Sequence, residues 1–178
     1  MSGIILCRSK YGASKKYADW ISEETGFKVI DTKDADIKEV VNHDFVILGG
    51  GLYSETIAGI SFLKKNIGAL KGKRVIIYCC GASEYDEELI DMVKNKNLKD
   101  GLENVPMFYF QGAWDLDSMS LGDRTMCKMF IKMLSKKDPA TLSKSVKMFL
   151  DIKDKKCDWT NKEYITPLLD LIKKGEGK

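Results

Sequence analysis

Short apolar runs alternate with longer stretches of helical periodicity along most of this chain. The runs are bounded by glycines or charged residues, and the middle three are rich in Val and Ile with little alternation, as strands covered on both faces are. This alternation predicts βαβ units and an α/β fold built on a parallel sheet. The expected strands are residues 3–7, 27–31, 44–48, 74–80 and 105–110. Five such strands suit the order 2-1-3-4-5 or another doubly wound order.

The segments between these strands carry apolar residues at helical spacing. Residues 13–25 form the clearest amphipathic helix, and Gly26 after them suits a left-handed C-cap. Further helices are expected at residues 58–67, 86–98 and 124–134, with a short one around residues 143–150. A last helix is expected to begin near residue 158 or 160, because Thr160 and Glu163 match a capping box. Pro167 is expected to kink or restart that helix.

The length and composition indicate one domain, residues 1–178. A chain of 178 residues with 44% hydrophobic content can build a core without disulfides. Its 29 basic and 26 acidic residues are interspersed, with a basic excess only at the C-terminal end, so no nucleic-acid surface is expected. Five cysteines, Cys7, Cys79, Cys80, Cys127 and Cys157, lack metal-ligand spacing. We expect reduced, mostly buried thiols and no metal site.

The N-terminal segment does not resemble a targeting signal. The apolar run at residues 4–6 is short and is followed by Arg8, which is the wrong flank for a signal peptide. No apolar stretch approaches the length of a membrane span. These features predict a cytoplasmic protein, which agrees with free thiols, and they leave peripheral membrane contact and the oligomeric state open.

The turn after the first strand has the composition of a phosphate-binding loop. It reads Ser9-Lys10-Tyr11-Gly12-Ala13-Ser14 and opens the clearest helix. It offers a hydroxyl at each end, a glycine that lets the backbone approach closely, and the amides at the positive end of a helix. These features favour a phosphate monoester, whose charge nearby lysines can offset. Taken alone, the segment also fits an ordinary turn with a serine N-cap.

Two further turns at the same edge of the sheet support a ligand site there, since ligands of open parallel sheets bind at the strands' carboxyl ends. The second turn, Gly49-Gly50-Gly51-Leu52-Tyr53-Ser54, contains three consecutive glycines, which favour close approach of the backbone to a flat ligand over a flexible connection. The third, Cys80-Gly81-Ala82-Ser83-Glu84-Tyr85, again places small residues before an aromatic. Tyr53 and Tyr85 are therefore candidate stacking partners for a ring system. Trp114 either edges the pocket or caps the core.

Several competing sites are excluded by spacing. The P-loop pattern is missing, and Ser54 occupies the last glycine position of a dinucleotide-binding GxGxxG. A phosphoacceptor domain needs acidic residues after the first strand, where this chain has Arg8 and Lys10. His43 is interpreted as a surface residue. The set Met126, Met129 and Met133 is expected to fill the core.

At these residues the chain resembles the flavodoxin family, and more closely its branch that includes the flavodoxin-type, quinone-dependent protoporphyrinogen dehydrogenases. Ser9, Gly12 and Ser14 fill the family's first-loop signature of a hydroxyl residue, two variable positions, glycine, a variable position and a second hydroxyl. Residues 45–51 resemble that branch's turn beside the flavin. Residues 112–113, 127–137 and 157–159 are similar to its C-terminal third, so the resemblance covers nearly the whole chain.

The resemblance implies a flavodoxin-like three-layer sandwich of strand order 2-1-3-4-5 that binds FMN without a covalent bond. The phosphate is then expected in the first loop and the isoalloxazine between the second and third. The chain departs from the porphyrinogen-oxidising members, which carry a long basic insertion after the fourth strand, because residues 84–88 are acidic here. It also departs from the strongly acidic electron carriers, since its net charge is +3.

Three functions follow from this resemblance. The favoured one is an FMN-dependent oxidoreductase that exchanges electrons with a quinone, a porphyrinogen or a similar small partner, with the flavin performing the chemistry. The second is a flavodoxin-type electron carrier between redox proteins. The third is a non-catalytic interaction module that has kept the fold. The sequence identifies no catalytic acid or base.

Overall fold

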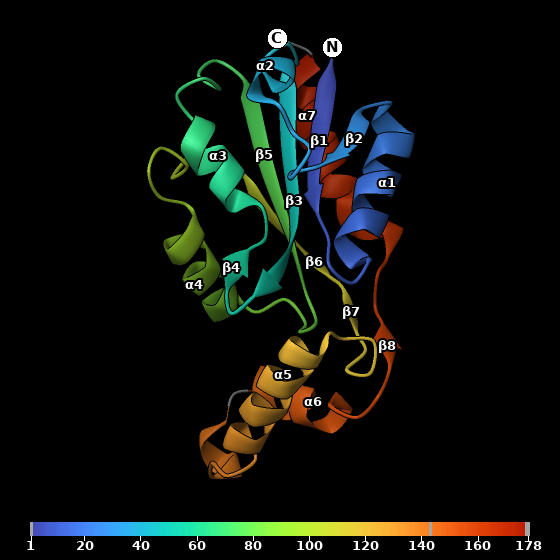
Figure 1. Ribbon diagram of the computed structural model, residues 1–178, viewed down its shortest axis with the longest axis vertical. Helices are drawn as coiled ribbons and strands as arrows, with labels where there is room; N and C mark the ends of the chain where they lie inside the picture. Colours follow the sequence, from blue (N-terminus) through green and yellow to red (C-terminus); the bar gives the residue numbers. More distant parts are fainter. Residues whose placement is uncertain (1, 143, 177–178) are drawn as a thin grey trace.

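A five-stranded parallel sheet forms the centre of the computed structural model, which describes residues 2–142 and 144–176. Its strands are β1 (Gly3–Arg8), β2 (Lys28–Asp31), β3 (Phe45–Tyr53), β5 (Arg74–Gly81) and β6 (Met107–Gln111). They lie in the order β2-β1-β3-β5-β6, and the short β4 (Thr56–Ile57) pairs antiparallel with β3 (Figure 1). The flavodoxin-like order 2-1-3-4-5 is therefore confirmed for the five main strands.

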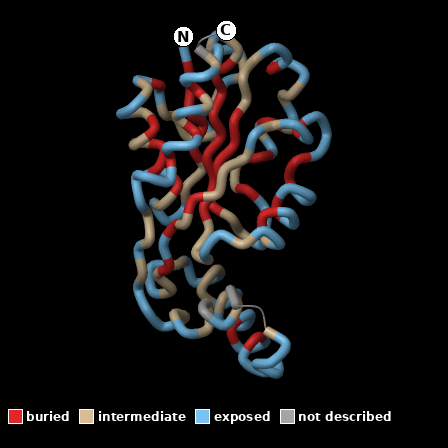
Figure 2. The backbone as a smooth tube through the Cα atoms, turned by 180° about the vertical axis from the view of Figure 1, so that it is seen from behind, coloured by how far each residue is buried: buried red, intermediate tan, exposed pale blue. Residues whose placement is uncertain are grey.

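Helices cover both faces of this sheet. On one face, α1 (Ala13–Thr25) and α7 (Thr166–Glu176) pack against β-strand residues such as Ile5, Ile47 and Tyr78. On the other face, α2 (Ile37–Val40), α3 (Ile60–Asn66) and α4 (Glu87–Asn97) pack against the alternate residues, including Leu6 and Leu48. Figure 2 shows the buried residues concentrated in the strands between these layers. The expected three-layer sandwich is confirmed.

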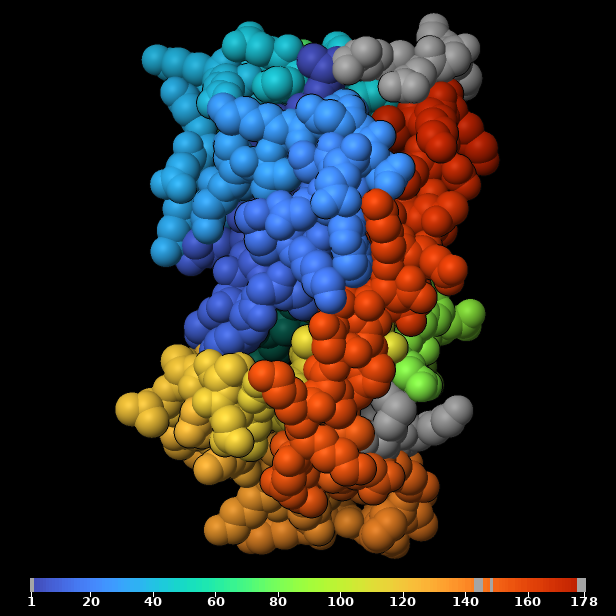
Figure 3. Space-filling model, turned by 90° about the vertical axis from the view of Figure 1, so that its right-hand side faces the viewer, coloured from blue at the N-terminus to red at the C-terminus, as the bar shows by residue number. Residues whose placement is uncertain are grey.

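A second unit lies beyond the carboxyl ends of the strands (Figure 1). It contains α5 (Leu121–Leu134), the 3-10 helix η1 (Pro139–Thr141) and α6 (Lys144–Ile152). The antiparallel pair β7 (Ala113–Trp114) and β8 (Cys157–Asp158) connects it to the sheet, and the returning chain runs along the side seen in Figure 3. We call residues 121–152 the α5–α6 unit. Most of its described residues are exposed to solvent (Figure 2).

The expected helices are found, with changes at their ends. The helix at residues 13–25 is confirmed, with Gly26 in the left-handed conformation, whereas α5 begins three residues earlier than expected because Ser120 caps it. The expected Thr160–Glu163 capping box is wrong. Asn161 caps a 3-10 helix, η2 (Lys162–Ile165), instead. The chain then restarts as α7, with Pro167 in its first turn. The sequence did not predict α2, β4, β7 or β8.

The free thiols agree with expectation, because Cys7, Cys79 and Cys80 are buried and Cys127 and Cys157 half-buried, all without disulfides. Within residues 2–142 and 144–176, no helix combines the length and apolar character that a membrane crossing needs. Over the same residues, no three potential ligand side chains gather into a metal site.

Candidate functional site

A cavity of about 530 Å³ lies where the carboxyl ends of β1, β3 and β5 meet the α5–α6 unit. This volume is within the ~300–1,000 Å³ typical of small-molecule sites. Eleven of the residues expected at the site line it: Ser9, Tyr11, Ala13, Ser14, Gly51, Leu52, Tyr53, Cys80, Gly81, Ala82 and Trp114. The tertiary structure thus brings all three predicted turns to one cavity.

The first turn leads directly into α1. Gly12 is the N-cap residue with φ 96°, a conformation that favours glycine, and no side chain caps the helix. Ser9 Oγ accepts a hydrogen bond of 3.1 Å from the Gly12 amide, which shapes the turn. Ser14 is almost fully buried and still reaches the cavity wall. The uncapped amides at the start of α1 therefore lie beside the cavity.

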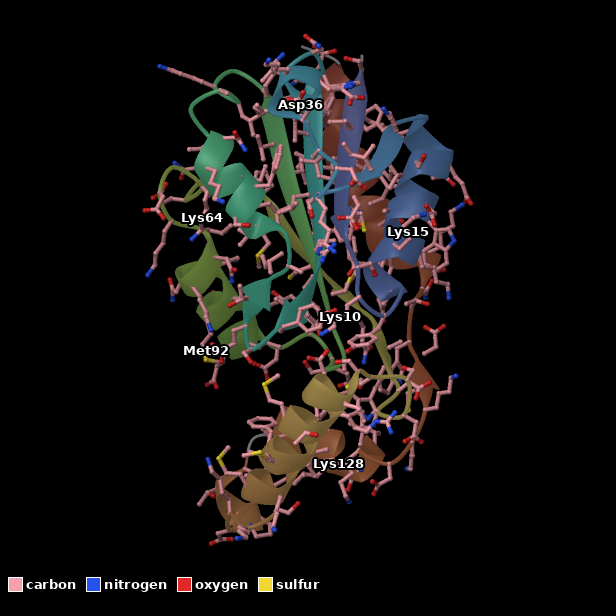
Figure 4. The ribbon with its side chains drawn as sticks, viewed as in Figure 1. Lys10, Lys15, Asp36, Lys64, Met92 and Lys128 are labelled. Carbon is pink, nitrogen blue, oxygen red and sulfur yellow. The ribbon has the colours of Figure 1, made fainter. Side chains whose placement is uncertain are left out.

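Lys10 and Tyr11 both bond a carboxylate that comes from the far side of the cavity. The Lys10 ammonium and the Tyr11 hydroxyl donate to Asp123 Oδ2, on the first turn of α5. These two hydrogen bonds hold the pKa of Asp123 below its usual range, and the same carboxylate raises the pKa of Lys10. Figure 4 shows Lys10 between the sheet and α5. The first turn therefore holds an anionic group in this structure.

The glycines of the second turn have a different role from the one expected. Residues 49–51 are not a turn, because β3 continues through them to Tyr53. A Cβ at Gly49 would lie 1.9 Å from the Tyr78 ring, and a Cβ at Gly50 would lie 2.2 Å from the Ala58 carbonyl oxygen. Both glycines thus make room for neighbouring parts of the protein, and only Gly51 lines the cavity.

The aromatic residues also divide. Tyr53 lies in the cavity wall, with its ring edge-on to Tyr11 at 6.4 Å. Tyr85 lies outside the cavity, is 64% exposed, and packs edge-on against Tyr109. Trp114 lines the cavity and is only 6% exposed. Its indole N–H donates a hydrogen bond of 3.1 Å to the Lys153 carbonyl oxygen. Of the two tyrosines expected to stack on a ring, Tyr53 lines the cavity and Tyr85 does not.

The remaining expected residues do not line this cavity. They are Lys10, Gly12, Gly49, Gly50, Ser83 and Tyr85. Gly12 borders a small neighbouring pocket at α1 and Ser83 borders another near α4. Lys10 still acts at the site through its contact with Asp123.

The titratable groups of the cavity wall include a buried thiol and a partly buried phenol. Cys80 is its innermost thiol, and burial raises its pKa well above the usual value despite the hydrogen bond with Ser14. A thiol of raised pKa stays protonated and is a poor nucleophile. Burial also raises the pKa of Tyr53. The Cys80 thiol and the Tyr53 phenol in the wall are therefore protonated at neutral pH.

Sequence reasoning missed the wall that α5 supplies. Asp123, Met126, Cys127 and Phe130 of α5 line the cavity together with Met119 just before the helix, although Met126 was expected in the core. That expectation is wrong, because Met126, Met129 and Met133 are 54%, 68% and 51% exposed. Ser54, Glu55, Lys96, Gly112 and Ala113 complete the lining. The helical spacing of apolar residues in α5 predicted the helix but did not predict its position beyond the carboxyl ends of the strands.

Comparison with known proteins connects this geometry to a family. The model of the flavodoxin domain matches residues 4–141. No curated protein matches. The solved structures that are similar include a Trp repressor binding protein from Bacillus subtilis, with 9% identity over 63% of this chain and 83% of that one, at a TM-score of 0.47. They also include the two-electron reduced flavodoxin of Megasphaera elsdenii, with 16% identity over 61% and 82%, at a TM-score of 0.42.

The match to the flavodoxin-domain model shows the family of this chain. That model extends over most of the chain, from β1 through the sheet into the α5–α6 unit. It does not single out the protoporphyrinogen dehydrogenase branch, whose resemblance stays a prediction. This chain belongs to the flavodoxin domain family.

Proposed function

We propose that the cavity binds FMN and that the protein is an oxidoreductase passing electrons through FMN to or from a small molecule. The observation that supports this most is the meeting of three features in one cavity. They are the uncapped start of α1, the end of β3 and the turn after β5. Flavodoxin domains typically bind FMN, which supplies the electron-transfer chemistry when bound.

The first turn fits the FMN phosphate. Backbone amides and the positive end of α1 favour an anion, and the Lys10 ammonium already holds the Asp123 carboxylate there. Ser9 and Ser14 place hydroxyl groups on the same wall. These residues would hold the phosphate and orient the rest of the cofactor across the strand ends.

The other walls fit a flat ring system. Gly51, Leu52 and Tyr53 supply one side, while Gly81 and Ala82 supply another with little side-chain bulk. The buried Trp114 and the α5 residues line this space on the side away from the sheet. The wall residues would thus orient a ring between the strand ends and α5.

The position of α5 favours a small molecule over a protein as the redox partner. In an electron carrier, the ring edge has to be open to a docking protein. Here Met126, Cys127 and Phe130 of α5 form part of the cavity wall on the side away from the sheet. The electron carrier therefore stays the second candidate, and the non-catalytic module the third.

The visible spectrum of the purified protein tests the proposal. After FMN is added and the excess removed by desalting, we expect retained absorbance in the flavin bands. The double variant Ser9→Ala, Ser14→Ala should weaken FMN binding by roughly 1–3 kcal/mol if both hydroxyls bond the phosphate. Ser61→Ala, on the exposed face of α3, is the matched control.

The outcomes separate the three candidate functions. A colourless protein that takes up no flavin would leave only the non-catalytic module. A flavin-loaded protein that reduces quinones with a chemical reductant supports the oxidoreductase. Rapid electron exchange with ferredoxin-type partners alone would identify a carrier.

A further inference from the structure

A second cavity adjoins the proposed flavin site. Its volume is about 330 Å³, and it lies between α4 and the α5–α6 unit. It shares a wall with the first cavity, formed by Leu52, Glu55, Gly81, Ala82 and Phe130. A molecule held in it would therefore lie beside the same wall of the sheet as the proposed flavin ring.

The walls of this second cavity are mainly apolar. Leu89 and Met92 come from α4, and Figure 4 labels Met92. Leu134 comes from α5 and Phe149 from α6. The Phe149 ring lies 4.8 Å from the Trp114 ring and 6.3 Å from the Phe130 ring. Such walls favour apolar and aromatic compounds of one or two rings.

The charged lining residues have one sign. Glu55, Asp86 and Glu88 contribute carboxylates, and among the described lining residues none is Lys or Arg. Glu55 is 3.6 Å from Lys96, and Asp86 accepts 3.1 Å from the Leu89 amide as the cap of α4. Glu88 is exposed. A ligand that carries carboxylates would meet the like charge of the exposed Glu88 carboxylate here.

We propose that this cavity is the acceptor site for an uncharged aromatic compound of one or two rings, such as an unsubstituted or methylated naphthoquinone, and that it discriminates against anionic acceptors. The proposal rests on the FMN function above. It selects among the acceptors left open there, because a porphyrinogen with its carboxylate side chains fits neither the size nor the charge of this cavity.

The proposed exchange balances for a quinone acceptor. The quinone would take up two electrons from the reduced cofactor and two protons, supplied by the reduced cofactor and by water, so that its two carbonyl groups become hydroxyls and the cofactor is left oxidised. Dithionite supplies the electrons in the test.

The test compares menadione with 1,4-naphthoquinone-2-sulfonate, which replaces the methyl group by an anion. The rate at which each quinone reoxidises the dithionite-reduced, FMN-loaded protein is measured by stopped flow. The rate of each variant is divided by the rate of the unmodified chain with the same quinone, so that differences in the intrinsic reactivity of the two quinones cancel. Ionic strength is kept constant because the sulfonate is charged.

Two variants probe the cavity. Val146→Trp fills it from α6 and should slow the menadione reaction by about tenfold. Glu88→Lys should raise the rate of the sulfonate relative to that of menadione by about fivefold. The matched controls are Met129→Trp, on the exposed face of α5, and Glu87→Lys, the neighbouring carboxylate outside the cavity. Neither control should change either rate by more than about twofold.

Equilibrium dialysis of menadione against cofactor-free protein separates this proposal from the FMN function. Weaker menadione binding by Val146→Trp than by Met129→Trp supports the site even if no flavin is retained. If flavin is retained while Val146→Trp binds and reduces menadione normally, the acceptor site is wrong and the FMN function stands. A sulfonate rate that Glu88→Lys leaves unchanged would overturn the charge selectivity.

Discussion

The Tyr78 side chain shows how a single residue position links the core to the candidate site. Its ring fills the space above Gly49, and its hydroxyl donates 2.8 Å to the Ser14 carbonyl at the start of α1. The side chain is fully buried, and its ring stacks 5.2 Å from Phe110. Position 49 therefore has to be a glycine to make room for the Tyr78 ring, and the Tyr78 hydroxyl in turn contacts the start of α1 after the first turn.

Gly49→Ala should destabilise the protein. The added methyl group would overlap the Tyr78 ring, which the closely packed core cannot accommodate without moving. We expect a loss of about 1–3 kcal/mol in the free energy of unfolding, measured by urea titration, together with weaker FMN binding because Tyr78 holds Ser14. Gly68→Ala is the control, since nothing lies within 4 Å of a Cβ there. Equal stability of both variants would contradict this packing role.

At the scale of elements, α5 determines the character of the site. One face of this helix lines the cavity with Asp123, Met126, Cys127 and Phe130, while Met129 on another face is exposed. The contact of its first turn with Lys10 joins the α5–α6 unit to the proposed phosphate loop. Only two residues of this helix, Ile131 and Leu134, are buried.

Asp123→Asn should strengthen FMN binding. The Asp123 carboxylate occupies the Lys10 ammonium and adds negative charge beside the place proposed for the phosphate. Removing that charge is expected to lower the FMN dissociation constant about fivefold at low ionic strength. The gain should shrink in 0.5 M salt, because exposed charges are screened. Flavin fluorescence quenching measures both values.

Asp151→Asn, on the exposed surface of α6, removes the same charge away from the cavity and serves as the control. Unchanged or weaker FMN binding by Asp123→Asn, with normal binding by the control, would show that Asp123 does not compete with the phosphate.

At the scale of the whole molecule, the sheet and the α5–α6 region differ in both burial and charge. The cores of β1, β3 and β5 are almost entirely buried, whereas Ile131 and Leu134 are the buried residues of α5. Residues 121–156 contain ten Lys or Arg and four Asp, a net charge of +6, so the rest of the chain carries −3. The basic excess therefore lies in this region of the chain.

The difference in burial predicts different local stability. In cofactor-free protein, amides of α5 should exchange with deuterium at least about tenfold faster than those of β1, β3 and β5, because few buried contacts hold the helix. FMN should slow exchange in α5, whose residues line the cavity, and leave α3 unchanged. Hydrogen exchange followed by mass spectrometry measures both effects. Protection of α5 equal to that of the strands would argue for a rigid α5–α6 unit.

Local sequence patterns were enough to predict the parallel sheet, its strands, the helix at residues 13–25 and the three segments that meet at the cavity. Strands and helices can be predicted in this way because apolar periodicity involves residues close together in the chain. The packing of Tyr78 against Gly49, the position of Tyr85 outside the cavity and the position of α5 at its far wall depend on contacts between distant segments. The contact between Lys10 and Asp123 joins residues 113 positions apart, and a periodic sequence pattern cannot predict a contact over that separation.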